Sequence, residues 1–384
     1  MWVLALSFIE SFATILLERG MYFFSHERLG YSEAENLWLA AGFGVTYAVG
    51  ARSSHALARR IGDRATLVST IGALTVLHAA LQYAASGWSL ALGFVLVGLC
   101  EGAKWPVVES YVASGLGPDA QLGAVGRFNV SWAAAVPLAL LATGPIVARA
   151  EPRALFGVAA LANVLSLALL RALPRSAPHL DSAHPSRPEP RVLERYRGLL
   201  AASRSSMLAS YALLFLLAPL LPGVFERLGA SVTEATAWAS GLDTVRLATF
   251  VFMAAVPIWQ GRRAPLLLAA LGLPLGFAAI SSGSSLALVL AGEVAFGVCA
   301  GLTYHAALYY ALVVRNAAVD AGGAHESLIG LGLVLGPGLG LLGQFAARSL
   351  GSDALGMLAS ASPLVLGCWF GSWRALRSRS FAPR

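Results

Sequence analysis

The sequence predicts an all-α membrane protein with twelve transmembrane helices, arranged as two six-helix bundles in a parallel, pseudo-symmetric repeat (6+6). Three observations support this prediction. Hydrophobic residues make up 57% of the 384-residue chain and charged residues 12%, with a mean hydropathy of +0.69. Soluble domains are usually about 45–50% apolar and about 25% charged. Apolar runs of about 17–25 residues, which can cross about 30 Å of hydrocarbon, recur from end to end. The third observation is an internal repeat.

The repeat has an offset of 199 residues. The string Glu-Arg-Leu-Gly occurs at Glu27–Gly30 and again at Glu226–Gly229. Charged residues are scarce in this chain, so a shared Glu-Arg pair is a stronger signal than shared Gly or Ala. The same offset matches Ser32, Glu35, Gly62, Arg64 and Tyr111 with Ser231, Glu234, Gly261, Arg263 and Tyr310. Six spans per half is an even number, so both halves would cross the membrane in the same direction, as a parallel repeat.

The twelve expected spans fall into two groups of six. In the first half, residues 1–174, they are Trp2–Phe24, Leu37–Leu57, Leu67–Ala85, Leu90–Ala113, Phe128–Ala148 and Ala154–Leu173. In the second half, residues 206–384, they are Met207–Phe225, Ala235–Trp259, Pro265–Ser281, Leu286–Val314, Leu328–Ala347 and Ala354–Trp373. The polar, Pro- and Arg-rich residues 175–205 are expected to form a cytoplasmic linker, with a short amphipathic helix from Val192 to Leu200.

Basic residues predict the orientation of these spans. Most of the 27 Lys and Arg residues fall in segments on one side, including Arg59-Arg60, Arg171–Arg204, Arg262-Arg263 and Arg374–Arg384. Cytoplasmic loops carry the excess of Lys and Arg. We therefore expect a multi-pass protein of the plasma (inner) membrane with both termini in the cytoplasm. The net charge of +7 would face anionic lipid headgroups of the bilayer, so no nucleic-acid partner is expected.

The loop after the second span carries a recognisable pattern. It reads His55-Ala-Leu-Ala-Arg59-Arg60-Ile-Gly62-Asp63-Arg64, and Gly261-Arg262-Arg263 repeats part of it in the second half. With the two six-helix halves and the basic central loop, this resembles the major facilitator superfamily of secondary transporters, whose loop reads Gly-x-Leu-Ala-Asp-Arg-x-Gly-Arg-Arg. Here Arg59 stands where that pattern has its acid, and Asp63 stands where it has a following basic residue, so the two charges are exchanged. A short loop that merely collects Gly and Arg is the plainer alternative.

The resemblance implies the major facilitator fold, with two halves that rock about a central site, but it names no substrate. It implies that the loop residues help to close the cytoplasmic gate: Arg59, Arg60, Gly62, Asp63 and Arg64. The eleventh span also resembles a Gly-Pro pattern of antiporters in this family, through Gly336 and Pro337, although those antiporters carry it in their fifth helix. Close helix packing explains these small residues equally well.

Ionisable residues in the first span are candidates for a substrate or proton site. Such residues cost about 2.5–3.5 kcal/mol each on insertion scales and usually face water or a partner. Glu10 and Glu18 recur with Ser7 and Thr14 on one polar stripe, as helical spacing allows. We expect Glu10 to take part in a proton or substrate site. Glu18 and Arg19 could do the same or form an outer-end ion pair.

The fourth span predicts a second charged group. Glu101 and Lys104 are three residues apart and therefore neighbours on one helical face. Lys104 is the only lysine in the chain, and a desolvated lysine can release its proton whereas arginine practically cannot. The group is expected to face the cavity and bind substrate or titrate. A buried ion pair that only holds helices together is the alternative.

The second half offers a matching set. Asp243 and Arg246 are again three residues apart and are expected to face the cavity. At the 199-residue offset Tyr304 matches Trp105, so each half places an aromatic residue near mid-span, and at least one of the two is expected to line the substrate site. His305 could titrate near neutral pH or simply pack. On the cytoplasmic side, Arg127 and Glu326 occupy matching positions with opposite charge and are expected to help close the inner gate.

These residues predict a secondary transporter for a small polar or charged organic solute, working by alternating access. Proton coupling as a symporter is expected because carboxylates occur in the spans of both halves. A carrier that exports drugs or hydrophobic compounds, and a non-transporting sensor or assembly protein on the same fold, remain alternatives. No enzyme is expected, since neither a His-rich metal set nor a Gly-x-Ser-x-Gly motif is present. No cofactor or metal is expected, because the three cysteines lack CxxC spacing. The protein is expected to be a monomer.

Overall fold

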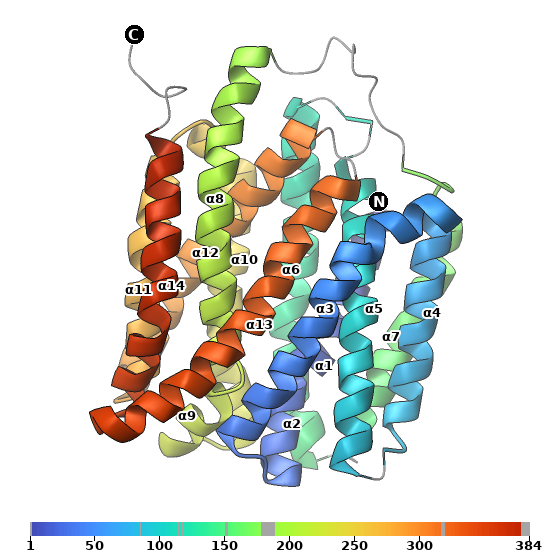
Figure 1. Cartoon of the computed structure of the whole chain (residues 1–384). Helices are drawn as coiled ribbons and strands as arrows, with labels where there is room; N and C mark the ends of the chain where they lie inside the picture. The colour runs from blue at the N-terminus through green and yellow to red at the C-terminus, as the bar shows by residue number, and fades with distance from the viewer. Residues whose placement is uncertain are drawn as a thin grey trace.

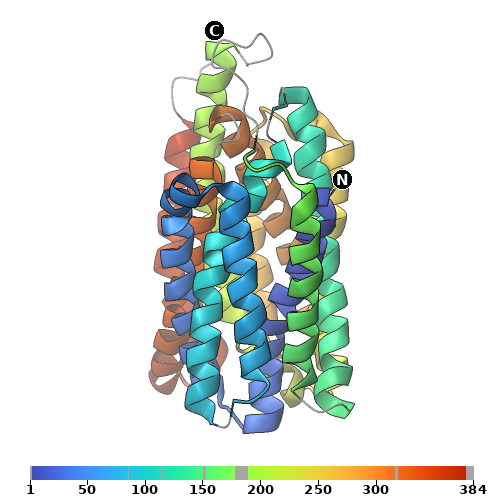
Figure 2. The same ribbon diagram turned by 90° about the vertical axis from the view of Figure 1, so that its right-hand side faces the viewer.

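The computed structural model describes residues 2–84, 86–113, 115–116, 118–149, 153–177, 189–315 and 319–377. These residues form an all-helical bundle whose long helices run side by side along one axis (Figure 1). Figure 2 shows the same bundle from the side formed by α4 (Asp63–Leu81), α5 (Gly87–Ala113) and α7 (Ala154–Leu169). In Figure 1 the chain starts and α14 (Asp353–Leu376) ends toward the upper end of the bundle.

The remaining helices follow in chain order. Those of the first half are α1 (Trp2–Glu18), α2 (Gly20–Leu29), α3 (Glu33–Ile61), α6 (Pro118–Arg149) and the 3-10 helix η1 (Leu170–Ala172). Those of the second half are α8 (Pro190–Leu217), α9 (Leu221–Arg227), α10 (Val232–Ala255), η2 (Pro257–Trp259), α11 (Ala264–Ser282), α12 (Leu286–Arg315) and α13 (Val319–Leu350). The first span of each half is interrupted: α1 gives way to α2 at Arg19, and α8 ends before Ala218, which is the match of Arg19 at the 199-residue offset.

Nine helices in the described part of the chain are long and apolar enough to cross a membrane: α4, α5, α6, α7, α8, α11, α12, α13 and α14. They identify an integral multi-pass membrane protein. Three of the twelve expected spans are not among them, and they correspond to α1 with α2, to α3 and to α10. The reason is that α1 stops after 17 residues, while α3 and α10 carry charged residues such as Arg52 and Asp243 along their length.

The second span of each half begins with the same capping box. Ser32 Oγ accepts a hydrogen bond from the backbone N–H of Glu35, and the Glu35 carboxylate accepts one of 2.8 Å from the backbone N–H of Ser32. Ser231 and Glu234 repeat this arrangement with a 2.9 Å bond. Both boxes satisfy N–H groups that a helix start leaves unpaired. The bonds from Ser32 and Ser231 lower the pKa of Glu35 and Glu234 at these exposed helix starts.

Helix α13 lies between α3 and α8 because small residues allow close approach on both sides. A Cβ atom added at Gly44 of α3 would lie 2.4 Å from the Leu333 carbonyl oxygen of α13. One added at Gly336 of α13 would lie 2.3 Å from the Ala212 carbonyl oxygen of α8. These contacts fix the side chains of α13 near the centre of the bundle.

The C-terminal part of the expected linker, from Pro190 onward, belongs to a long helix in the structure. Residues 178–188 lie outside the described residues, but the expected amphipathic helix, Val192 to Leu200, is not a separate element. It is the first part of α8, which continues without a break to Leu217 and crosses the expected domain boundary at residue 206. No proline follows Pro190 in this helix, so nothing in the sequence stops it.

Candidate functional site

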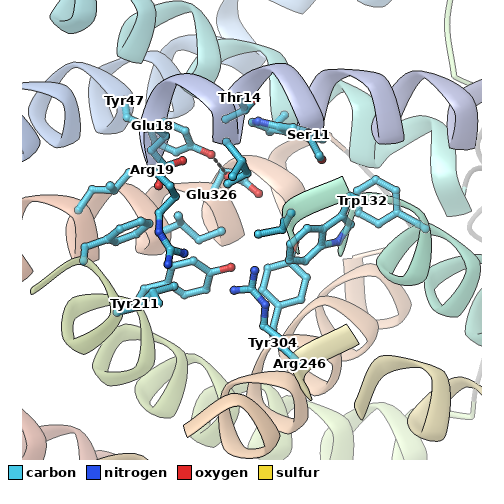
Figure 3. Close-up of a pocket in the computed structure, with 18 residues that line it drawn as sticks. Ser11, Thr14, Glu18, Arg19, Tyr47, Trp132, Tyr211, Arg246, Tyr304 and Glu326 are labelled. Carbon is cyan, nitrogen blue, oxygen red and sulfur yellow. Dashed lines mark hydrogen bonds between the residues drawn. The ribbon is translucent and has the colours of Figure 1, made fainter. Parts of the chain in front are cut away.

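A cavity of about 90 Å³ lies at the centre of the bundle, between helices of both halves of the chain. This volume exceeds the roughly 30 Å³ that one water occupies in the liquid. Figure 3 shows the labelled side chains that point into it. The polar and aromatic residues that line it are Ser11, Thr14, Glu18, Arg19, Tyr47, Trp105, Phe128, Trp132, Tyr211, Phe215, Arg246, Tyr304 and Glu326.

Two arginines of this cavity share one buried aspartate. Arg19 Nη1 lies 3.2 Å from Asp243 Oδ2, and Arg246 Nη2 lies 2.7 Å from Asp243 Oδ1. Asp243 is fully buried behind the two arginines, and they, unlike Asp243, line the cavity. Arg19 Nη2 and Arg246 Nε are buried without a hydrogen-bond partner among the described residues. The pair of guanidinium groups therefore has donors left over for an anionic or polar solute.

Aromatic rings form a wall beside these arginines. The guanidinium of Arg246 lies over the Trp132 ring, 4.9 Å from its centroid, which is within the range of a cation–π interaction. Trp132 meets Tyr304 edge to face at 5.1 Å, and Tyr304 lies 6.1 Å from Tyr211. Arg19 and Arg246 point toward the same part of the cavity as the Tyr211 side chain (Figure 3). A solute bound there would meet both positive charge and aromatic surface.

The charged group of the fourth span lies behind the cavity wall. Lys104 Nζ is 2.7 Å from both Glu10 Oε2 and Glu101 Oε2, and all three side chains are fully buried. Glu10, Glu101, Lys104 and Asp243, which were expected to face the cavity, are not among the residues that line it. Carboxylates and cations satisfy one another in the interior instead, since an unpaired buried charge is very costly.

Hydrogen bonds connect this carboxylate–lysine cluster to the cavity. The Glu101 carboxylate accepts bonds from Thr14 Oγ1 at 2.8 Å and from Trp105 Nε1 at 3.1 Å, and both donors line the cavity. Glu101 Oε1 has no partner among the described residues. Two carboxylates and one ammonium give the cluster a charge of −1 when all are ionised. Glu101 is therefore bonded directly to residues of the cavity wall.

On its other side the cluster reaches two residues that the sequence did not single out. Asn163 Nδ2 donates to Glu10 Oε1 at 3.1 Å, and Asn163 Oδ1 lies 2.7 Å from His78 Nδ1. Both residues are fully buried. A lone Asn and a lone His in otherwise apolar spans were the available signal, but the sequence gives no means of knowing that they face Glu10.

Of the other predicted site residues, some line the cavity and one does not. Trp105 and Tyr304 both line the cavity, as do Glu18, Arg19 and Arg246. His305 does not line it. Its ring is buried, with Nδ1 3.2 Å from Asn129 Nδ2, and it packs edge to face on Trp259 at 5.3 Å.

The loop residues expected at the cytoplasmic gate contact the chain that follows α7. Asp63 accepts a 2.9 Å hydrogen bond from the backbone N–H of Ala177, and Arg64 donates one of 3.1 Å to the Leu173 carbonyl. Gly62 joins α3 to α4 with a φ of 90°, a conformation that favours glycine. Arg59 and Arg60 are exposed and form no ion pair with a described residue.

Arg127 and Glu326 are not brought together. Arg127 is exposed, whereas Glu326 is 3% exposed and accepts a hydrogen bond from the Tyr47 hydroxyl (Figure 3). Gly336 packs against α8 as described above, and Pro337 follows it inside α13.

Comparisons with known proteins agree with this architecture. The family model described as Major Facilitator Superfamily matches residues 3–337. Among solved structures, the crystal structure of the human organic anion transporter MFSD10 (TETRAN) aligns with a TM-score of 0.71. The alignment covers 97% of this chain and 98% of that chain at 14% sequence identity, so it shows a shared fold. No curated protein matches the chain by sequence.

Proposed function

The chain belongs to the Major Facilitator Superfamily, and we propose that it is a proton-coupled secondary transporter of small organic anions. Membership of this superfamily supports a transporter rather than an enzyme. The sequence alone led us to expect a polar or charged solute. The two arginines in the cavity now favour a negatively charged one.

The single observation behind this choice is the pair of arginines at one buried carboxylate. Arg19 and Arg246 share the single negative charge of Asp243, so one positive charge is left over. Glu18, which lines the same cavity, balances that charge only while its carboxyl is ionised. Guanidinium groups bind carboxylate and phosphate through paired N–H donors. The name of the similar MFSD10 structure, an organic anion transporter, points the same way. The aromatic wall formed by Trp132, Tyr211 and Tyr304 favours anions that also carry an apolar or ring portion.

The proton is proposed to bind at Glu101 rather than at Glu10, which the sequence favoured. Glu10 accepts hydrogen bonds at both of its oxygens, from Lys104 and Asn163. Glu101 has a free oxygen and contacts residues of the cavity wall. Protonation of Glu101 would leave a neutral Glu10–Lys104 pair, which a membrane interior tolerates better than a net charge.

The proposed mechanism is alternating access between two halves of six spans each, α1–α7 and α8–α14. In each half the first span is made of two helices, α1 with α2 and α8 with α9. Matching capping boxes and matching breaks in the first spans support this division, since both recur at the 199-residue offset. Rocking of such halves about a central site is the general mechanism of parallel-repeat carriers. We propose a monomer in the plasma (inner) membrane, with both termini in the cytoplasm and with protons moving in symport.

A binding screen can test the anion assignment before the solute itself is identified. Purified protein would be heated with a panel of small mono- and dicarboxylates, each paired with its neutral amide. A ligand that binds the folded state raises the apparent melting temperature by mass action. We expect at least one acid to stabilise the protein while its amide does not. Equal stabilisation by acids and amides, or by cations only, would contradict the assignment.

A further inference from the structure

A second group of buried side chains lies between α5 and α13, away from the carboxylate–lysine cluster. Glu109 comes from α5, and His325 and Glu326 come from α13. Each offers one possible ligand atom, and these atoms lie within 4.8 Å of one another. The side chains are 1%, 0% and 3% exposed. A charged group at this depth normally has a partner.

Few polar atoms of this group have one. Both ring nitrogens of His325 are buried without a hydrogen-bond partner among the described residues, and so are the oxygens of Glu109, except that the Glu326 carboxyl can share a proton with them. In the same part of the chain no Lys or Arg forms an ion pair with Glu109 or Glu326. The Tyr47 hydroxyl, which donates to Glu326, supplies one hydrogen bond and no charge. Two carboxylates and an imidazole thus converge on one place, and no Lys or Arg among the described residues forms an ion pair with them.

We propose that Glu109, His325 and Glu326 bind a divalent first-row transition-metal ion. One such ion would neutralise both carboxylates and accept the lone pair of a neutral imidazole nitrogen at once. Mixed carboxylate and imidazole ligands suit Mn²⁺, Fe²⁺, Co²⁺ and Zn²⁺, whereas Mg²⁺ and Ca²⁺ prefer oxygen ligands alone. The sequence did not suggest this site, because Glu109 is more than 200 positions from His325 and only helix packing unites them.

The packing of the two helices favours such a site. Gly322 of α13 faces Glu109, and a Cβ atom added there would lie 2.7 Å from Glu109 Oε2. The His325 ring is held edge to face by Tyr304, with centroids 4.9 Å apart. Glu326 also lines the central cavity, so part of the coordination sphere adjoins the solute pathway. A bound ion would stabilise the arrangement in which α5 and α13 touch.

Metal titration of the purified, full-length protein tests the proposal. After treatment with a chelator, the protein would be titrated with Mn²⁺ and with Zn²⁺, using Mg²⁺ as a comparison, and followed by calorimetry and thermal unfolding. We expect about one transition-metal ion per chain and a raised melting temperature, with no comparable effect of Mg²⁺. Glu109→Gln and His325→Ala should each weaken binding by more than about tenfold, since even outer-shell changes cost about 10–100-fold.

A matched control is available in Glu293 of α12. It is also a buried carboxyl whose two oxygens have no partner among the described residues, but it belongs to no such group. Glu293→Gln should bind metal like the parent. If both ligand variants also bind like the parent, or if the parent shows no saturable binding, the site does not exist.

The nitrogen ligand gives a readout that can be measured on the parent protein itself. Pulsed electron paramagnetic resonance of Mn²⁺ bound to the parent protein should reveal coupling to one imidazole nitrogen, and that coupling should disappear in His325→Ala. Bound Mn²⁺ without nitrogen coupling would overturn the assignment. So would stabilisation at low pH that needs no metal, because two carboxyls sharing a proton would then explain the group.

Discussion

Arg19 and Asp243 are 224 positions apart in the chain, and Arg19 Nη1 lies 3.2 Å from Asp243 Oδ2. The contact joins the break between α1 and α2 to the middle of α10. The same aspartate binds Arg246, so one buried carboxylate holds two cations of the central cavity. This arrangement underlies both the stability of the site and its proposed preference for anions.

The first prediction concerns this shared carboxylate. Asp243→Asn should destabilise the protein by about 3 kcal/mol, because it leaves two largely buried guanidinium groups without their counter-ion. The double variant Arg19→Gln with Asp243→Asn should lose less than the sum of the two single changes, as measured by thermal or chemical unfolding in one detergent. Strict additivity would mean that the two residues do not interact.

The sequence predicted an all-helical membrane protein and its family, and both are confirmed. Hydropathy predicted the membrane helices because it depends on many residues at once, and the loop pattern from His55 to Arg64 pointed to the family. Individual sites were harder. Spacing placed Glu101 and Lys104 on one face of a helix, but it could not tell whether that face met the cavity or Glu10 of another helix. The division into six-plus-six helices stays a prediction, supported by the capping boxes of Ser32 and Ser231.

The sequence did not predict the cavity residues that only the packing of the helices brings to the site. Tyr211, Trp132 and Tyr47 reach the cavity from three different helices, and an aromatic residue in an apolar span is an ordinary core residue by its sequence. Arg19 was identified, but its partner across the bundle was not. Long-range pairing of this kind depends on how the two halves face each other, which no local pattern encodes.

The second prediction distinguishes the two carboxyls near Lys104. Glu101→Gln imitates the protonated form, so it should abolish accumulation driven by a pH gradient in proteoliposomes while substrate counterflow continues. Glu10→Gln removes one of the two carboxylates that pair with Lys104 and disturbs the bonds from Asn163, so it should lower thermal stability and reduce both activities together. Undiminished uphill accumulation by Glu101→Gln would move the proton site elsewhere.

The third prediction uses two glycines of one helix. Gly336→Ala forces a Cβ against the Ala212 carbonyl, 2.3 Å away, and such overpacking usually costs about 1–3 kcal/mol. Gly338→Ala meets no atom within 4 Å and should be neutral or stabilising by up to about 1 kcal/mol, since alanine favours helix. Thermal unfolding of the two variants side by side measures the difference. A similar loss in both would show that α13 does not pack closely on α8 at Gly336.

The fourth prediction concerns the loop between α3 and α4. Asp63→Ala removes the acceptor for the Ala177 N–H and a negative charge at the start of α4, and should cost about 1 kcal/mol. Arg59→Ala should change stability little, because Arg59 is exposed without an ion pair among the described residues. Exchanging the two charges, Arg59→Asp with Asp63→Arg, should therefore behave like the loss of Asp63 alone. Recovery to parental stability in the exchanged variant would argue for a charge pair instead.

The most direct test of the account is anion uptake by the reconstituted protein with and without Arg246. Proteoliposomes would be given an inward proton gradient and a radiolabelled carboxylate chosen from the binding screen. The parent and Arg52→Gln, an exposed arginine of α3, should accumulate the label, and Arg246→Gln should lose at least about tenfold in apparent affinity, equivalent to about 1.4 kcal/mol. Uptake by Arg246→Gln that matches the parent, or accumulation that ignores the proton gradient, would contradict a proton-coupled anion transporter with its site at Arg19 and Arg246.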